Sequence, residues 1–256
     1  MLAFVQVAGA VARRNLLVTF KNPALILPAA IFPLVFLLAF AGGLSNLANV
    51  PGFSFPSGYT SFQFVFVFLQ SAAFGGVFTG FAVAGDYESG FARRLMLAAP
   101  NRTGLIMGYV LAGVGRFTFT GLVVTIAGLA AGMQVDGGVV ELGGLLVLAV
   151  LVNVVATLFG VGLCMRTQSM QSVPFLQIPV FTILFMAPVY VPLDLLDGWI
   201  AAVAPYNPAT AFLEAGRGFI SGEPDGVLVA FAAVAAMVAL LGFYALRGLR
   251  KAEAGG

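Results

Sequence analysis

Six long apolar runs, separated by short polar segments, dominate the pattern of the chain. Each run has about the 20 residues that a helix needs to cross the roughly 30 Å hydrocarbon core of a bilayer. The runs cover residues 24–43, 60–84, 104–133, 142–165, 173–193 and 226–246. The pattern therefore predicts an all-α integral membrane protein, in which residues 1–256 form a single transmembrane domain with six membrane-spanning helices.

The chain before the first run, residues 1–22, has apolar residues at helical spacing together with basic residues. The basic residues are Arg13, Arg14 and Lys21. A helix of this kind lies in the membrane interface on anionic lipid, and we expect it to end at Asn22–Pro23. A ragged extension of the first span is the alternative, which the cost of charged residues in hydrocarbon disfavours.

A short charged segment, residues 86–98, stands between the second and third runs. Acidic residues open it, basic residues follow and Pro100 ends it, an order that complements the dipole of a short helix. Asp86 or Ser89 can cap its first N–H groups, and apolar residues share one face at helical spacing. Its characteristic residues are Asp86, Tyr87, Glu88, Gly90, Phe91, Arg93, Arg94, Leu95 and Ala98. Such a helix cannot cross a bilayer, so we expect it at the cytoplasmic surface, where a partner can push on it.

A segment of intermediate hydropathy, about residues 194–222, separates the fifth and sixth runs. Asn207 and Pro208 form a helix start, with an N-cap followed by proline at the first helical position, and Gly218 or Gly222 can end that helix. We expect two short helices that dip into the outer leaflet as a re-entrant hairpin. Such backbone is tolerated at membrane depth only where protein buries it or where it lines a cavity. A plain surface loop is the alternative, which the aromatic and aliphatic content of the segment disfavours.

Three charged residues lie in apolar surroundings. Glu214 and Arg217 are three residues apart, so they can pair on one helix face. Arg116 lies inside the third run, in its inner half. It can extend to lipid headgroups, pair with Glu88 or Asp86, or meet an anionic group of a substrate, in that order of preference.

Composition indicates the class of protein, and the distribution of charge indicates its orientation in the membrane. Hydrophobic residues make up 61% of the chain and charged residues 9%, against about half and a quarter in soluble domains. Every basic residue except Arg116 and Arg217 lies on one side of the predicted spans. The positive-inside rule makes this side cytoplasmic, with both termini there.

Several kinds of chemistry are excluded or disfavoured by the residues available. The chain has no histidine, which excludes His-based acid–base catalysis and His metal ligands. Neither lysine, Lys21 or Lys251, stands in the GxxxxGK[ST] pattern of a P-loop, so the chain cannot bind ATP in that manner alone. Ion-coupled carriers usually place acidic residues inside the membrane, whereas the acids here lie in loops, span ends or the outer segment.

Small residues repeat every four positions in two of the runs. The strips are Gly76, Gly80 and Ala84 in the second run and Gly104, Gly108 and Ala112 in the third. Strips of this kind let two helices approach closely. Polar residues inside the runs, among them Gln63 and Asn153, are best interpreted as hydrogen-bond partners between helices.

The arrangement resembles the permease subunit of type-2 ABC exporters, and most closely the daunorubicin-resistance-like branch. The resemblance covers essentially the whole chain and rests on two motifs. The first comprises Asp86, Glu88, Gly90, Arg94 and Pro100, and the second comprises Asn207, Pro208, Arg217 and Gly222. The resemblance implies a non-catalytic subunit of a prokaryotic cell (inner) membrane that exports an amphipathic drug, lipid or glycan. It implies two copies of the permease, or one copy and a related permease, bound to two ATPase subunits.

The resemblance also assigns roles to residues. Contact with the ATPase would come from Asp86, Tyr87, Glu88, Gly90, Phe91, Arg93, Arg94, Leu95, Arg13 and Arg14, and the outer gate from Asn207, Pro208, Glu214 and Arg217. The chain itself would bind no cofactor, because ATP and Mg²⁺ belong to the partner, and its other contacts would be with membrane lipids and not with nucleic acid. The alternative is a self-sufficient carrier or channel that needs no ATPase.

Overall fold

The computed structural model describes residues 2–254, and within that range all the regular structure is helical. The helices are α1 Leu2–Lys21, α2 Pro23–Gly43, α3 Gly58–Glu88, α4 Phe91–Ala98, α5 Thr103–Ala130, α6 Val139–Thr167, α7 Pro174–Phe185, α8 Gly198–Val203, α9 Pro208–Ser221 and α10 Val227–Ala254. Short 3-10 turns are η1 Ser45–Asn49, η2 Met170–Ser172, η3 Leu193–Leu195 and η4 Ala204–Tyr206. Five of these helices, α2, α3, α5, α6 and α10, are long and apolar enough to cross a membrane. The chain is therefore an all-α integral membrane protein, as its sequence predicts.

The fifth predicted span, residues 173–193, is shorter in the structure than expected. α7 has only 12 residues, about 18 Å of helix, which is less than the roughly 30 Å of a hydrocarbon core. The physical reason lies in Pro188, because a proline disfavours helical geometry at the residue before it and cannot donate a backbone hydrogen bond. The chain after Phe185 turns and leads to η3 and α8 instead of continuing as helix.

α3 is the central helix, and it packs along α6, α5 and α2. The predicted small-residue strip is confirmed, because a Cβ atom built at Gly76 would lie 2.6 Å from the Ala156 Cβ atom and from the Thr157 backbone nitrogen. At Gly80 it would lie 3.0 Å from the Gly160 Cα atom. α3 and α6 therefore meet backbone to backbone, which side chains at these positions would prevent.

The second strip has the same function against a different helix. Cβ atoms at Gly104 and Gly108 would lie 3.1 Å and 2.6 Å from the Cβ atoms of Val7 and Val11 on α1. The predicted N-terminal helix is therefore packed closely on α5, and it is not a continuation of the first span. Asn153 also confirms its predicted role, since its Nδ2 atom donates to the Ala72 carbonyl across the α3–α6 contact at 2.8 Å.

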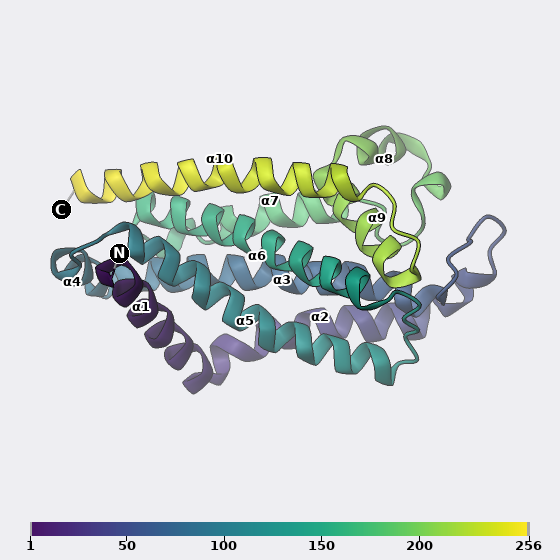
Figure 1. The fold of residues 1–256 in the computed structure, drawn as a ribbon, viewed down its shortest axis with the longest axis horizontal. Helices are drawn as coiled ribbons and strands as arrows, with labels where there is room; N and C mark the ends of the chain where they lie inside the picture. The colour runs from purple at the N-terminus through teal and green to yellow at the C-terminus, as the bar shows by residue number, and fades with distance from the viewer. Residues whose placement is uncertain (1, 255–256) are drawn as a thin grey trace.

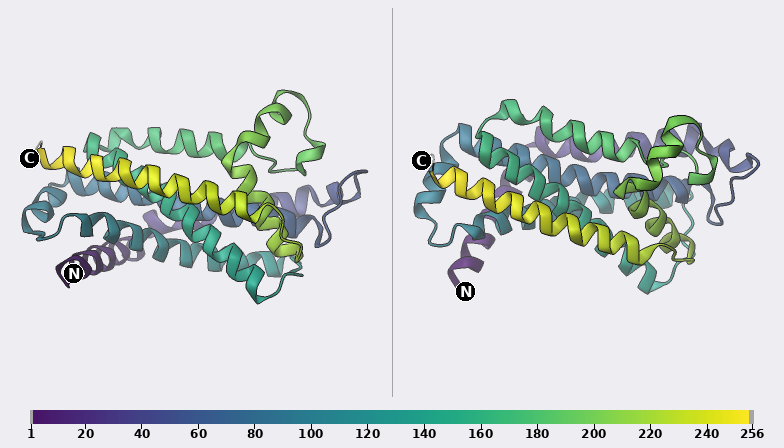
Figure 2. Two further views of the ribbon diagram at one scale, coloured as in Figure 1. Left: turned by 45° about the horizontal axis from the view of Figure 1, so that its top comes forward. Right: turned by 90° about the horizontal axis from the view of Figure 1, so that it is seen from above.

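The two ends of the bundle differ in what they carry. The start of α1, the end of α10 and all of α4 lie at one end, whereas α8, α9 and the α2–α3 connection lie at the other (Figure 1). The turned views show the same separation, with α1 running obliquely to the long helices (Figure 2). We call these the α4 end and the α9 end.

Two cysteines should report which end faces the cytoplasm. Leu97 lies in α4 and is 85% exposed, and Gln134 is an exposed residue of the α5–α6 connection at the α9 end. In a Cys164→Ala background, Gln134→Cys should react with a membrane-impermeant maleimide in intact cells. Leu97→Cys should react only after permeabilisation, because the basic residues collect at the α4 end. Labelling of Leu97→Cys in intact cells, with Gln134→Cys protected, would reverse the orientation.

Candidate functional site at the two ends of the bundle

The predicted charged helix 86–98 is two elements in the structure. α3 continues to Glu88, and α4 begins only at Phe91. Gly90 separates them with a φ of 71°, a left-handed conformation that glycine adopts without strain. Neither Asp86 nor Ser89 caps α4, because the N-cap position is Gly90, which has no side chain. The prediction of one helix capped by Asp86 or Ser89 is wrong.

Asp86 has internal partners that explain why α3 does not stop before it. Its carboxylate accepts hydrogen bonds from the Arg14 Nη1 atom at 2.7 Å and from the Tyr109 hydroxyl at 2.8 Å. The Arg14 guanidinium also lies over the Phe91 ring, 3.7 Å from its centroid. One buried carboxylate and one arginine thus join α1, α3, α5 and α4, an arrangement in which an ion pair is also hydrogen-bonded.

Tyr87 and Glu88, the two residues after Asp86, attach the end of α3 to two other segments. The Tyr87 side chain is buried, and its hydroxyl lies 3.6 Å from the Met96 sulfur of α4. The Glu88 carboxylate accepts from the backbone N–H of Met170 at 2.7 Å and from the Ser169 hydroxyl at 3.4 Å. Glu88 therefore connects the end of α3 to the turn between α6 and α7.

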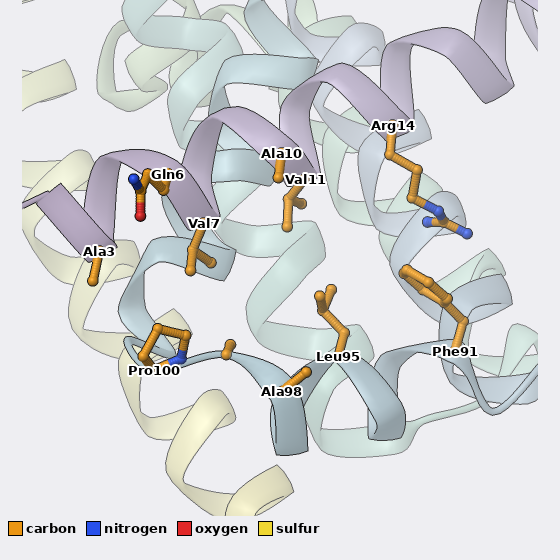
Figure 3. A pocket seen from close by; sticks show the side chains of 11 residues that line it. Ala3, Gln6, Val7, Ala10, Val11, Arg14, Phe91, Leu95, Ala98 and Pro100 are labelled. Atoms are coloured by element: carbon orange, nitrogen blue, oxygen red, sulfur yellow. The ribbon is translucent and has the colours of Figure 1, made fainter.

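α1 and α4 enclose an apolar cleft of about 520 Å³ at the α4 end (Figure 3). Val7 and Val11 of α1 face Phe91 and Leu95 of α4 across it, and Arg14 closes one side. The predicted apolar face of α4 thus faces α1 and leaves the other sides of the helix available.

The exposed residues of α1 and α4 are those that a partner could contact. At the α4 end they include Arg13 on α1 and Arg93, Arg94 and Leu97 on α4. Leu97 was not among the predicted residues, although an apolar residue in a charged segment was a signal for it. We call these four residues, together with the cleft, the α1–α4 platform.

At the α9 end, the start of α9 is the one its sequence predicts. The Asn207 side chain accepts from the Ala209 backbone N–H at 3.0 Å, and Pro208 occupies the first helical position. The Asn207 Nδ2 atom donates to the Ile183 carbonyl at 2.6 Å, which attaches α9 to α7. Gly222, with a φ of 78°, is the residue that ends α9.

Arg217 of α9 is almost fully buried and holds three segments together. Its Nη1 atom donates to the Glu214 carboxylate at 2.9 Å, so the predicted pair is present. Its Nη2 atom donates to the Pro188 carbonyl at 2.7 Å, and its guanidinium lies over the Phe62 ring of α3, 3.4 Å from the centroid. Burial lowers the pKa of Arg217 to about 10 and Glu214 opposes this shift, so the side chain stays charged at neutral pH.

α3 supplies further contacts to the same segment. The Gln63 Nε2 atom donates to the Val189 carbonyl at 2.9 Å and to the Tyr59 hydroxyl at 2.8 Å. The Tyr59 hydroxyl is 3.3 Å from the Tyr190 carbonyl. We call the contact of Arg217 with Phe62 and the contacts of Arg217 and Gln63 with residues 188–189 the outer clasp.

Arg116 does not pair with the acids that its sequence position suggested. It is 3% exposed, and its Nη2 atom donates to the Asn15 side chain of α1. Asp86 is held by Arg14 and Glu88 by the turn at Met170, so neither is available. Within residues 2–254, Arg116 has no ion pair and its Nε atom has no hydrogen-bond partner.

The acidic residues of the described range are dispersed. Asp86 pairs with Arg14, Glu214 with Arg217 and Glu253 with Arg102. Among residues 2–254, no group of three or more histidine, cysteine, aspartate or glutamate side chains could hold a metal ion.

Comparison with known proteins identifies a family for most of the chain. A sequence-family model with the description "ABC-2 type transporter" matches residues 6–220, a range from α1 into the last turn of α9. No curated protein matches the chain. The matched range includes the α1–α4 platform, the outer clasp and Arg116.

Proposed function

The chain belongs to the ABC-2 type transporter family and is a transmembrane permease of an ABC transporter; from this premise we propose that it exports an amphipathic drug, lipid or glycan from the cytoplasm. The energy comes from ATP hydrolysis by a separate ATPase subunit, since no lysine of this chain stands in a P-loop. The chain itself is non-catalytic and binds neither ATP nor Mg²⁺. The observation that carries the proposal is the family match over residues 6–220.

The α1–α4 platform is the surface that we assign to the ATPase. α4 is a short helix outside the long bundle, and its Arg93, Arg94 and Leu97 side chains are exposed. An apolar residue one helical turn after two arginines suits a groove with an acidic rim. Arg14 lies over Phe91 and fixes α4 to α1, and Tyr87 contacts Met96 and fixes α4 to the end of α3. Asp86 and Glu88 hold that end of α3 to α1 and to the α6–α7 turn.

Two copies of the permease, or this chain and a related permease, form the transporter in this proposal. Much of α2 and α10 is apolar and uncovered, since only 22% of the residues in the spanning window of α2 and 11% of those in α10 are buried. These faces meet lipid or a second permease. The platform of each copy would receive one ATPase, and the outer clasp would close the path at the α9 end. The daunorubicin-resistance-like branch and the location in a prokaryotic cell (inner) membrane, with both termini cytoplasmic, are part of this proposal.

A pull-down from native membranes tests the partnership. The tagged chain should co-purify with an ABC ATPase subunit, and Arg94→Glu combined with Leu97→Asp should reduce the recovered ATPase by about tenfold or more. The reason is that a charge reversal and a buried carboxylate at one contact each remove about 1 kcal/mol or more of binding free energy. The assay measures the ATPase recovered per permease.

Arg247→Glu is the matched control, because Arg247 is an exposed residue of α10 outside the platform and the same charge reversal is made there. It should leave recovery unchanged. Equal recovery of the ATPase with the platform variant and with the wild type would show that α4 is not the contact. Absence of any ATPase from the wild-type pull-down would favour a self-sufficient carrier or channel.

A further inference from the structure

A second pocket, of about 430 Å³, lies between α1, α3 and α5, on the other side of Arg14 from the α1–α4 cleft. Its walls are largely apolar, with Val18 of α1 and Phe78, Phe81 and Ala82 of α3. From α5, the residue that lines the pocket is Arg116. We call this space the inner pocket.

The inner pocket has an uncompensated positive charge. Asp86 and Arg14 line it, but they form an ion pair with each other, so their charges cancel. Arg116 remains, buried and bonded to the neutral Asn15 side chain, with its Nε atom unpartnered in the described range. A buried cation without a counter-charge is costly, and an anion in the pocket would offset that cost.

The position of the inner pocket indicates where such an anion would come from. It lies along the second half of α1, residues 14–19, a few residues before α2 begins as the first spanning helix. An interfacial helix that passes into a span does so at the level of the lipid headgroups. The side of α1 away from the pocket is apolar there, with Leu17 42% and Phe20 45% exposed, as suits contact with acyl chains.

We propose that the inner pocket binds an anionic membrane lipid, with its phosphate on Arg116 and an acyl chain along Val18, Phe78 and Phe81. A guanidinium is well suited to a phosphate because it offers parallel N–H donors to two oxygens. The apolar walls give a lipid an advantage over a free anion, since they can bury a hydrocarbon chain. The inference requires only that the chain lies in a membrane, and it does not depend on what is exported.

Thermal unfolding of the purified full-length chain in neutral detergent tests the proposal. Phosphatidylglycerol should raise the melting temperature in a saturable manner, and phosphatidylcholine at the same concentration should not. Arg116→Gln should weaken the apparent affinity for phosphatidylglycerol by about tenfold or more, the loss expected for one charge-assisted contact. Arg247→Gln, which removes an exposed arginine of α10 outside the pocket, should behave as the wild type.

A second variant keeps the test decisive if Arg116→Gln does not fold. Ala82 is half-buried and lines the pocket, so Ala82→Phe should fill the space for the lipid while Arg116 and Asn15 remain in place. It should also abolish the phosphatidylglycerol effect. An unchanged effect in either folded variant would overturn the proposal. The same shift with inorganic phosphate alone would assign the site to a soluble anion and overturn the lipid.

Discussion

Gly76→Ala should sharply reduce the amount of folded protein, although alanine is normally the better helix former. A Cβ atom at this position would lie 2.6 Å from the Thr157 backbone nitrogen and 2.8 Å from the Ala156 carbonyl carbon. Backbone atoms cannot move aside as a side chain can, so α3 and α6 must separate. Overpacking of this kind lowers the free energy of unfolding by about 1–3 kcal/mol. Because α3 is the central helix, we expect a loss at the upper end of that range. The measurement is the melting temperature of the purified chain and its monodisperse yield.

The same substitution nine residues further along α3 provides the control. A Cβ atom at Gly85 would meet nothing within 4 Å, so Gly85→Ala should be neutral or slightly stabilising through its helix propensity. Equal melting temperatures for the two variants would mean that α3 and α6 are not in backbone contact.

Arg217→Ala should open the outer clasp and reduce export, while ATPase recovery stays at the wild-type level. The variant loses the bond to the Pro188 carbonyl, the ion pair with Glu214 and the contact with the Phe62 ring. Loss of a buried charged donor destabilises the chain by roughly 2 kcal/mol or more, and this loss falls on the α9 end. The measurements are the melting temperature, the efflux of an amphipathic dye from cells that express the transporter, and the ATPase pull-down on the same sample.

Glu214→Gln is the milder comparison, because it removes the counter-charge of the buried Arg217 but leaves the bond to the Pro188 carbonyl and the contact with the Phe62 ring. It should lose less export and less of the melting temperature than Arg217→Ala. Arg217→Lys should fall between the two, since an ammonium cannot stack on Phe62 and bond two acceptors as a guanidinium does. Suppose instead that Arg217→Ala reduces ATPase recovery, while export per recovered complex stays at the wild-type level. The assignment of the α4 end to ATPase binding and of the α9 end to closure of the path would then be wrong.

Features set by neighbouring residues could be predicted from the sequence. The start of α9 needs only Asn207 and Pro208, whose side-chain bond and fixed φ act within three residues. The strip of Gly76 and Gly80 showed that α3 has a close partner, because spacing on one helix face is a local property. The choice of α6 as that partner was not predictable, since it depends on Ala156 and Gly160, about 80 residues away.

The errors concern contacts between distant residues. Asp86 was placed on the charged helix because its bond to Arg14, 72 residues earlier, cannot be read from the chain. Arg116 was expected to extend to lipid headgroups or, as the second choice, to pair with an acid, yet its partner is Asn15, 101 residues away. Two other errors were local and had a signal in the sequence. Gly90 can adopt positive φ, which allows the break before α4, and Pro188 disfavours helix, which accounts for the early end of α7. The charge pattern of residues 86–98 and the apolar length of residues 173–193 were given more weight than these two residues.

The length of α3 has a mechanical consequence. The helix is continuous from Tyr59 and Phe62 at the outer clasp to Asp86 and Glu88 beside α4, about 45 Å at 1.5 Å per residue. It therefore acts as a rigid lever, with its pivot where Gly76 bears on α6. A tilt of about 10° about Gly76 moves the outer end of the helix, about 25 Å away, by roughly 4 Å, which is more than the length of a hydrogen bond. We expect a displacement of α4 to be transmitted along α3 in this way, so that Phe62 and Gln63 move away from Arg217 and residues 188–189.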